Sequence, residues 1–401
     1  MKKNAPHMRR FSNRPHFWFA VLLIIFFAHV YLYLAVGRRL STPSEAVWLC
    51  IGLAAVMSSA AAPHVGAPRN ATGKISLRSV LQRWGAFWNI LVLFTAFFML
   101  VLEIAYHLHP SYGDAHRISL WLSLSAAGAL CLYGLVEARN VRSTSFVLPT
   151  EKLPPGGHLR VVHLTDLHIG PFMNVGQIAR AVCATLAAKP DIVLITGDIV
   201  DGLVGDEKGE LPYYVPFSKK LLEIAESAPR LGVWAVPGNH DYYEGFENSA
   251  AFIENSGVTL LRGEKVDLGE VVLLGADDLD HAWQSERDEN LTKSESLVAS
   301  LSPQEREKFV VLLRHRPVVE PSTVGIFDLQ LSGHTHGGQL LPLPSSMHRI
   351  PGKPKGLLGL GRGSSLYVSN GAGFVGPPMR FFAPAEIAVI DIVAPVSNPF
   401  G

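Results

Sequence analysis

Long apolar runs in the first third of the chain restrict its fold most strongly. Residues 17–36 contain no Asp, Glu, Lys or Arg, and about 20 helical residues cross the roughly 30 Å of hydrocarbon in a bilayer. Further apolar runs lie at residues 46–62, 84–105 and 118–136, of which the alanine-rich second is the weakest. Only helices and closed barrels satisfy their backbone groups in lipid. We therefore predict a membrane domain over residues 1–140 with four transmembrane helices.

A signal peptide is the alternative for the first apolar run. A basic stretch precedes the run and small residues follow it at 35–37, but the run is longer than the roughly 7 to 15 apolar residues of a signal sequence. The polar exceptions within the spans, His29 and Glu103, lie near span ends, where snorkelling or hydrogen bonding between helices accounts for them. The spans contain no relay of ionisable residues, which argues against a transporter.

Basic residues in the short loops predict the orientation of the membrane domain. With the N-terminus inside, eleven of the fourteen lysines and arginines near the span ends are cytoplasmic, as the positive-inside rule requires. The C-terminal part of the chain is then also cytoplasmic. We accordingly predict a multi-pass protein of a bacterial inner membrane.

Overall composition excludes some functions. The formal net charge is +1, so there is no basic excess of the kind that accompanies nucleic-acid binding. The three cysteines are too few and too scattered for a disulfide framework.

After the membrane domain the pattern changes to that of a soluble α/β domain. Residues 141–157 are rich in proline and glycine and predict a linker. Strand-like runs at 160–165, 191–196, 232–236, 271–274, 309–313, 366–368 and 387–392 then alternate in part with helical patterns at 174–189, 217–228 and 246–255. We predict one domain over residues 158–395.

Polar side chains follow the apolar strands of this domain, at the points where the strands end. Ligands of open α/β sheets bind at the carboxyl ends of strands, so we expect these side chains to meet in space. The candidate metal donors are Asp166, His168, Asp198, Asn239, His315, His334 and His336. Taken singly, each is also explained as a turn cap or a histidine bonded to the backbone. Seven oxygen and nitrogen donors are too many for one ion and suit two, with Asp198 as the bridging carboxylate.

The order of these clusters resembles the calcineurin-like metallophosphoesterases. The matching motifs are Asp-x-His at 166–168, Gly-Asp at 197–198, Gly-Asn-His-Asp at 238–241, His315 after an apolar strand, and Gly-His-x-His at 333–336. Segments 275–278, 337–339, 367–371 and 376–378 look like a bacterial membrane-associated branch of that superfamily. The resemblance covers residues 158–393 and leaves the membrane domain and the substrate open.

The resemblance implies a four-layer α/β/β/α sandwich with a binuclear metal site. The first ion would be held by Asp166, His168, Asp198 and His336, and the second by Asp198, Asn239, His315 and His334. His240 would be the catalytic histidine outside the ligand set, and we expect Asp241 to orient it.

Two divalent cations suit phosphoester hydrolysis because they neutralise the phosphoryl oxygens and lower the pKa of a bridging water to give hydroxide. With no cysteine among the donors, Mn, Fe, Zn or Co fits the site. His240 would protonate the leaving oxygen.

The sequence thus predicts a membrane-anchored, metal-dependent phosphoester hydrolase, with a phosphodiester or a phosphomonoester as substrate. A proline- and glycine-rich stretch with leucines and basic residues, 340–365, is either a solvated loop or a lid at the bilayer. We extend the hypothesis to a lipid or lipid-linked phosphoester, because only about 30 residues separate the last span from Asp166. The alternative is a membrane sensor or scaffold whose domain binds a phosphorylated ligand without turnover.

Overall fold

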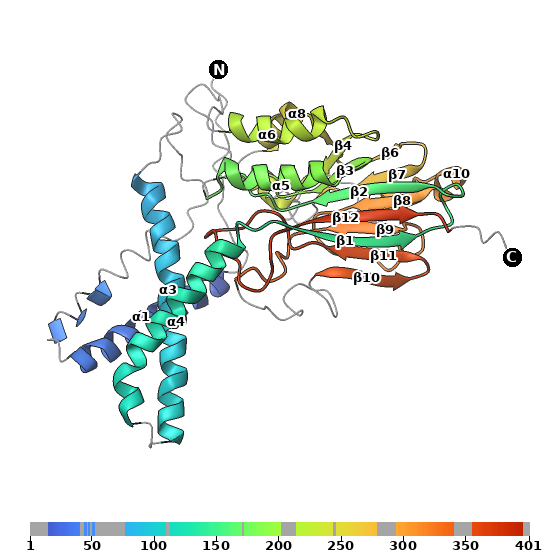
Figure 1. Cartoon of the computed structure of the whole chain (residues 1–401). Helices are drawn as coiled ribbons and strands as arrows, with labels where there is room; N and C mark the ends of the chain where they lie inside the picture. Colours follow the sequence, from blue (N-terminus) through green and yellow to red (C-terminus); the bar gives the residue numbers. More distant parts are fainter. Residues whose placement is uncertain are drawn as a thin grey trace. The chain divides into compact units, whose positions relative to one another are not determined.

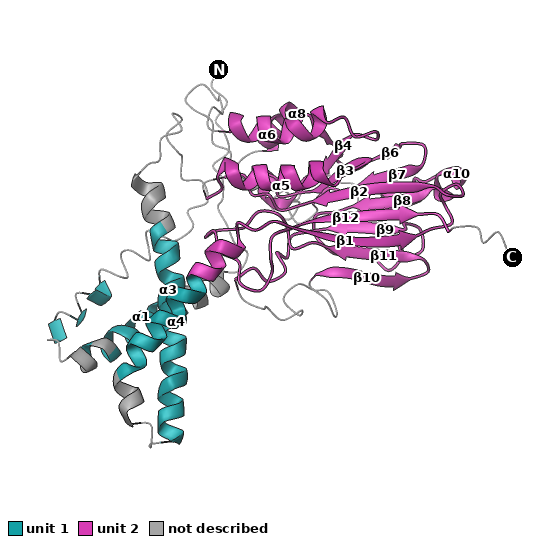
Figure 2. Ribbon diagram, viewed as in Figure 1, with its two compact units in different colours: residues 1–62, 80–131 teal, residues 63–79, 132–401 magenta. Residues whose placement is uncertain are grey.

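The structure, a computed structural model, describes residues 15–40, 44–45, 47–48, 50–52, 77–109, 113–170, 172–201, 214–243, 246–278, 294–340 and 355–395. The chain divides into two compact units (Figure 2), one made of residues 1–62 and 80–131 and the other of residues 63–79 and 132–401. Each unit is described by itself.

The long helices among the described residues of the first unit are α1 (Pro15–Leu40), most of α3 (Leu77–Leu108) and most of α4 (Gly113–Glu137). Apolar side chains of α1, α3 and α4 pack together, among them Ala35, Met99 and Leu120. The indole of Trp88 donates a hydrogen bond to His29 at 3.1 Å, and the hydroxyl of Tyr31 donates one to Glu103 at 2.6 Å. Both polar exceptions of the predicted spans therefore have a partner on a neighbouring helix.

Two stretches of the described helices are long and apolar enough to cross a bilayer, Trp84–Leu108 and Ile118–Glu137. The described apolar part of α1, Leu23–Ala35, is shorter. Most of the predicted span at 46–62 lies outside the described residues. Two of the four predicted spans, at 84–105 and 118–136, thus correspond to long apolar helices. The spans at 17–36 and 46–62 stay predictions.

The second unit is built on two six-stranded sheets (Figure 1). The first has the order β1-β12-β2-β3-β4-β5 and the second β10-β11-β9-β8-β7-β6. The strands of the first sheet are β1 (Arg142–Pro149), β2 (His158–Leu164), β3 (Ile192–Thr196), β4 (Val233–Val236), β5 (Thr259–Leu260) and β12 (Glu386–Val393). Those of the second are β6 (Glu264–Asp267), β7 (Val271–Gly275), β8 (Phe309–Leu313), β9 (Leu329–Ser332), β10 (Gly356–Gly361) and β11 (Ser364–Val368).

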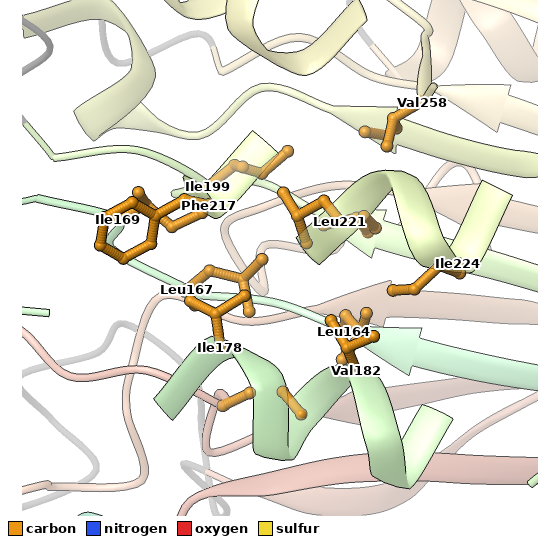
Figure 3. Close-up of a cluster of buried hydrophobic side chains, with 14 of the residues drawn as sticks. Leu164, Leu167, Ile169, Ile178, Val182, Ile199, Phe217, Leu221, Ile224 and Val258 are labelled. Atoms are coloured by element: carbon orange, nitrogen blue, oxygen red, sulfur yellow. The ribbon is translucent and has the colours of Figure 1, made fainter. Parts of the chain in front are cut away.

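Apolar clusters on both faces of each sheet produce the expected layers. One cluster joins the facing sides of the two sheets and includes Val161, Leu194, Leu273 and Val311. Another packs helices against the outer face of the first sheet (Figure 3). Because β3, β7 and β8 are buried along their whole length, they read as continuous apolar runs, which is typical of parallel strands covered on both sides.

Helices supply the outer layers. The helices of the second unit are α5 (Val175–Ala187), α6 (Val215–Glu226), α7 (Asn239–Tyr243), α8 (Phe246–Asn255), α9 (Ser294–Ala299) and α10 (Pro303–Arg306). Asn174 caps α5 in a capping box with Gln177. Figure 3 shows Ile178 and Val182 of α5 and Phe217 and Leu221 of α6 among the side chains of this core.

The segment predicted as a linker forms a strand instead. Residues 142–149 are β1, which pairs in parallel with β12 from Arg142↔Glu386 to Pro149↔Val393. Phe146 and Leu148 are half-buried and pack on the core between the sheets. Pro149 is tolerated because it ends a strand at the edge of the sheet. The proline and glycine content of the following turn concealed the short alternating pattern of β1.

The described part of the proline-rich stretch at 340–365 forms regular structure. Residues 341–354 lie outside the described residues, whereas Gly356–Gly361 forms β10 and pairs antiparallel with β11. Residues 356–361, which we predict as part of a loop, therefore form one strand of a hairpin.

A buried histidine makes the fold sensitive to acid. His163 is fully buried beside Thr196, its Nε2 2.7 Å from the hydroxyl, and burial lowers its pKa from 6.5 to about 3. Below pH 6.5 the unfolded chain takes up a proton that the folded chain does not. The free energy of unfolding is therefore not reduced by this proton uptake above pH 6.5. It decreases progressively as the pH falls from 6.5 toward 3.

We expect His163→Gln to reduce this acid sensitivity. At pH 5 the effect on wild type amounts to about 2 kcal/mol, at 1.36 kcal/mol per pH unit. Thermal unfolding of the full chain at pH 7.5 and pH 5 measures it, and the drop in Tm should be smaller for His163→Gln than for wild type. Equal drops would show that His163 does not set the acid limit.

Candidate metal centre

The turns after β2 and β3 are bonded to each other and carry three of the predicted ligands. The backbone N–H of Asp166 donates to the carbonyl of Gly197 at 3.0 Å, and that of His168 donates to the carbonyl of Asp198 at 2.9 Å. Both turns begin where parallel neighbours end, because β2 and β3 pair in register from Val161↔Ile192 to Leu164↔Ile195. The sheet thereby brings residues 166–168 and 198 to one edge.

Backbone strain is concentrated at the predicted ligands. Eight described residues other than glycine have a positive φ. Five of them are predicted ligands: Asp166 (53°), His168 (46°), Asp198 (50°), His334 (70°) and His336 (48°). A side chain in the left-handed region costs free energy and persists where the surrounding structure enforces it, which is frequent at functional sites.

One group of donors forms around Asp166. The Nε2 of His336 lies 3.3 Å from Oδ1 of Asp166 and 3.1 Å from Nε2 of His168. The same nitrogen of His168 lies 3.6 Å from Oδ2 of Asp198. Two ligands of one ion at about 2.1 Å are about 3.0 to 3.4 Å apart. These spacings therefore fit donors that converge on a cation.

A second group forms on the other side of Asp198. The Nε2 of His315 lies 3.1 Å from Oδ2 of Asp198 and 3.1 Å from Nδ1 of His334. Asn239 is buried as the first residue of α7. The next backbone N–H, that of His240, donates to Oδ1 of Asp198 at 2.8 Å. Asp198 thus lies near donors of both groups, and its role as a bridging carboxylate stays a prediction.

The protonation states suit a cation at this position. Burial holds the pKa of His334 and of His336 well below 6.5, which leaves both rings in the neutral form that binds metals. Burial opposes ionisation of Asp198, but neighbouring His315 and His240 hold its pKa well below the usual range. Burial also opposes a charge on His315, yet Asp198 raises the pKa of that ring to about 10, so a cation bound by this ring would take the place of a proton. The centre therefore attracts positive charge.

Glycines at the centre leave space that a side chain would fill. A Cβ on Gly238 would overlap Oδ1 of Asp198, and one on Gly333 would overlap Oδ2 of Asp166. Both carboxylates thus approach the backbone more closely than an alanine would allow. The glycines that bracket the sequence motifs are required for this packing.

His240 pairs with a residue that the sequence analysis missed. Its Nδ1 lies 3.0 Å from Oδ1 of Asp201. Burial lowers the pKa of His240, but Asp198 and Asp201 outweigh that effect and raise it to about 9. The side chain of His240 is 19% exposed, whereas that of His168 is fully buried. His240 can therefore reach a substrate that binds over the two donor groups.

The predicted role of Asp241 is wrong. Its carboxylate accepts the backbone N–H groups of Ile199, Val200 and Gly238 at 3.0, 3.0 and 2.8 Å, so it fixes the turns that carry Asp198 and Asn239. Consecutive residues on a helix point about 100° apart, and α7 begins at Asn239, so His240 and Asp241 face in different directions. Asp201 lies three residues after Asp198, and no pattern in the sequence pairs it with His240.

We expect Asp201→Asn to lower kcat by about 10- to 100-fold without loss of metal, as is typical of a partner that orients a functional histidine. Turnover with a poor leaving group and metal content measured on the same sample test this. Asp391→Asn, which alters a carboxylate on β12 that binds Arg160, is the control and should leave kcat unchanged. Loss of metal in Asp201→Asn would show that Asp201 supports the ligands instead.

A buried arginine lies behind the centre. Arg380 is fully buried and donates to the carbonyls of Asn370, Gly371 and Gly373 at 2.9, 3.1 and 2.5 Å. Its Nη2 also lies 3.5 Å from Nδ1 of His336. Burial lowers the pKa of this guanidinium to about 10. The sequence analysis includes the neighbouring segment 376–378 in the family resemblance. It does not predict that Arg380 lies against the turn that carries His336.

Two further arginines lie against the acidic pair at 277–278. Arg262 donates to Asp277 at 2.7 Å, and Arg316 donates to both carboxylate oxygens of Asp278 at 3.0 and 3.1 Å. Arg316 follows His315 and contributes to the low pKa of His334. The two aspartates thus hold cationic side chains, and that of Arg316 is next in sequence to His315 of the second donor group.

Comparison with known proteins agrees with this geometry. Residues 159–338 match the family model "Calcineurin-like phosphoesterase". An uncharacterized metallophosphoesterase of Aquifex aeolicus is 33% identical over 262 residues, which are 65% of this chain and 95% of that protein. One from Campylobacter jejuni is 28% identical over 302 residues, or 74% of this chain and 75% of its own length.

A relative from Danio rerio is named as a transmembrane protein with a metallophosphoesterase domain. It is 30% identical over 283 residues, or 67% of this chain and 61% of its own length. In the described part of this chain, two helical stretches are long and apolar enough to cross a bilayer. With its family model, its relatives and its clustered His and Asp side chains, the chain belongs to the calcineurin-like phosphoesterases and is a metal-dependent phosphoester hydrolase.

Proposed function

We propose that this protein is a membrane-anchored phosphoester hydrolase with two metal ions, whose catalytic domain lies in the cytoplasm. The observation that carries the proposal is the position of Asp198 between two groups of donors, with His168 on one side and His315 on the other. One carboxylate shared by two groups is the arrangement that a pair of ions requires.

In this proposal the residues divide between the two ions as the family resemblance implies. Asp166, His168, Asp198 and His336 would hold the first, and Asp198, Asn239, His315 and His334 the second. When bound, divalent ions neutralise phosphoryl oxygens and lower the pKa of water, and the oxygen and nitrogen donors suit Mn, Fe, Zn or Co. A test is whether the apo protein regains activity with each of these ions in turn.

His240 acts on the leaving group. In the charged state that Asp198 and Asp201 favour, its exposed edge donates a proton to the departing oxygen. Asp201 holds the ring through Nδ1, which leaves Nε2 as the atom that faces the substrate. Asp241 has a structural role, because its three backbone hydrogen bonds hold the turns that carry Asp198 and Asn239.

We further propose a lipid or lipid-linked phosphoester as substrate, in a bacterial inner membrane. The support is the length of chain between the last apolar stretch, which ends at Glu137, and Asp166. Part of that length is taken up by β1 and β2, so the tether is shorter than the sequence suggested. The basic loop residues support the cytoplasmic orientation.

The test is a panel of phosphomonoesters and phosphodiesters, soluble and in vesicles, given to the full-length protein with each metal. We expect metal-dependent turnover, with lipid phosphates in vesicles preferred over soluble nucleotides. A protein that binds phosphorylated ligands without turnover under every metal would favour the sensor or scaffold alternative. Preference for nucleotides would refute the lipid substrate and leave the hydrolase intact.

A further inference from the structure

The end of α4 is bonded to a loop of the second unit. The backbone N–H of Arg380 donates to the carbonyl of Gly134 at 3.0 Å. The ring of Phe381 lies directly against Gly134, where a Cβ would come within 2.5 Å of it. All these residues belong to the second unit. Gly134 is needed here for close approach, because any larger residue would push the ring away.

This contact fixes the level of the loop relative to a bilayer that α4 crosses. The apolar stretch of α4 ends at Glu137, and Gly134 lies three residues earlier, or about 4.5 Å along the helix axis. The backbone of Arg380 therefore lies beside the last turn of the span. Residues next to it are at the depth where hydrocarbon gives way to headgroups.

The exposed side chains of the loop suit that depth. Phe381 is buried, but the adjacent Phe382 is 53% exposed and Val375 is 37% exposed. Single exposed apolar residues are ordinary on a soluble surface. Here, however, they belong to the segment that touches α4, whose own Leu132 and Val136 are 63% and 57% exposed. Aromatic rings are enriched at this level of membrane proteins.

Basic side chains accompany the exposed rings. Lys355 is exposed, and its Nζ donates to the carbonyl of Phe382 at 3.2 Å. Arg139, two residues beyond the end of the span, is also exposed. Lysine and arginine at the cytoplasmic surface each gain from anionic lipids. The combination of ring and cation indicates a bilayer as the occupant of this surface.

The same loop reaches the metal centre. The guanidinium of Arg380 lies 3.5 Å from His336. The backbone N–H of Phe381 donates to the carbonyl of Gln339 at 2.9 Å, and the side chain of Gln339 exchanges two hydrogen bonds with the backbone of Val375. Arg380 thus contacts the last turn of α4 through its backbone and the predicted ligand His336 through its side chain.

We propose that residues 375–382, with Arg139 and Lys355, form a surface that sits in the headgroup layer of an anionic bilayer and keeps the metal centre at headgroup level. This rests on the proposed function, in that α4 crosses the membrane. A phosphoester carried by a lipid then reaches the centre without leaving the bilayer.

The test uses nitroxide labels on full-length protein in vesicles of phosphatidylcholine and phosphatidylglycerol. Phe382→Cys carries the label in a background of Cys50→Ser, Cys131→Ala and Cys183→Ser. Val215→Cys is the matched control, because Val215 is also an exposed apolar residue of the same unit, at 47%, and starts α6. Relaxation by oxygen and by a water-soluble nickel complex reports the depth of each label.

We expect the label at 382 to be relaxed more by oxygen and less by nickel than the label at 215. Equal, water-like behaviour of both labels would overturn the proposal. Retained metal-dependent hydrolysis of a soluble nitrophenyl phosphoester shows that each labelled variant is folded. If Phe382→Cys is inactive, Val375→Cys replaces it with the same expectation.

The depth of the label tests the membrane surface, and hydrolysis of vesicle lipids tests the lipid substrate, so one proposal can be refuted without the other. A headgroup-level label at 382 with no hydrolysis of any vesicle lipid supports the surface and refutes the lipid substrate. A water-like label with rapid lipid hydrolysis refutes the surface and leaves the lipid substrate standing.

Discussion

Asp198→Asn should abolish metal-dependent phosphoester hydrolysis while the chain stays folded. Asp198 contacts both donor groups, His168 on one side and His315 on the other, so an amide in its place weakens both ion positions at once. Metal ions stabilise the transition state of such a reaction by several kcal/mol. At 1.36 kcal/mol per factor of ten, we expect kcat/KM to fall by about 1,000-fold or more.

The measurement is metal content beside activity on the same purified sample. Asp328→Asn is the control, because Asp328 is a partly buried aspartate outside the centre that accepts hydrogen bonds from Lys152 and the backbone of Val310. We expect the control to keep its metal and its activity. Full activity of Asp198→Asn with two ions bound would refute the bridging role.

His240→Ala should lower kcat by about 10²- to 10⁴-fold on a substrate with a poor leaving group, the range of general acid catalysis. The reason is the position of the ring, partly exposed and paired with Asp201 but outside both donor groups as we assign them. Nitrophenol leaves readily without a proton, so the loss should shrink for nitrophenyl esters. Metal content should stay close to that of wild type.

The comparison of alkyl and nitrophenyl esters decides the role of His240. His158→Ala is the control, since His158 is an exposed histidine that pairs with Asp391 of β12, and it should change neither rate. An equal loss for both kinds of ester would show that His240 positions the phosphate instead of protonating the leaving oxygen. Loss of metal would make it a ligand.

The motifs at the strand ends could be predicted because parallel strands bring their carboxyl ends together. Residues 166–168, 198 and 334–336 each follow an apolar run directly, so a sheet was sufficient to place them at one edge. The partner of His240 could not be predicted in the same way. That partner depends on the directions in which His240 and Asp241 point. The short helix α7 sets these directions, and the sequence does not show them.

Arg380 and β1 show a second limit of the sequence. A buried arginine that donates to several backbone carbonyls has no periodic pattern, and only the folded loop shows that it lies against His336. The pattern of β1 is short and half-exposed, and its partner β12 is the last strand of the chain. Pairing over such a distance leaves no local signal.

The place of β12 in the first sheet also determines when this protein can finish folding during synthesis. β12 lies between β1 and β2, and Thr144 of β1 bonds to Glu386, 242 residues later. Until the ribosome releases the C-terminal residues, β1 and β2 each lack this neighbour and expose an unpaired edge. Such long-range closure is slow and leaves nascent chains open to aggregation. A chain that stops before residue 386 would therefore be expected to go to proteolysis, although every metal ligand has already been made.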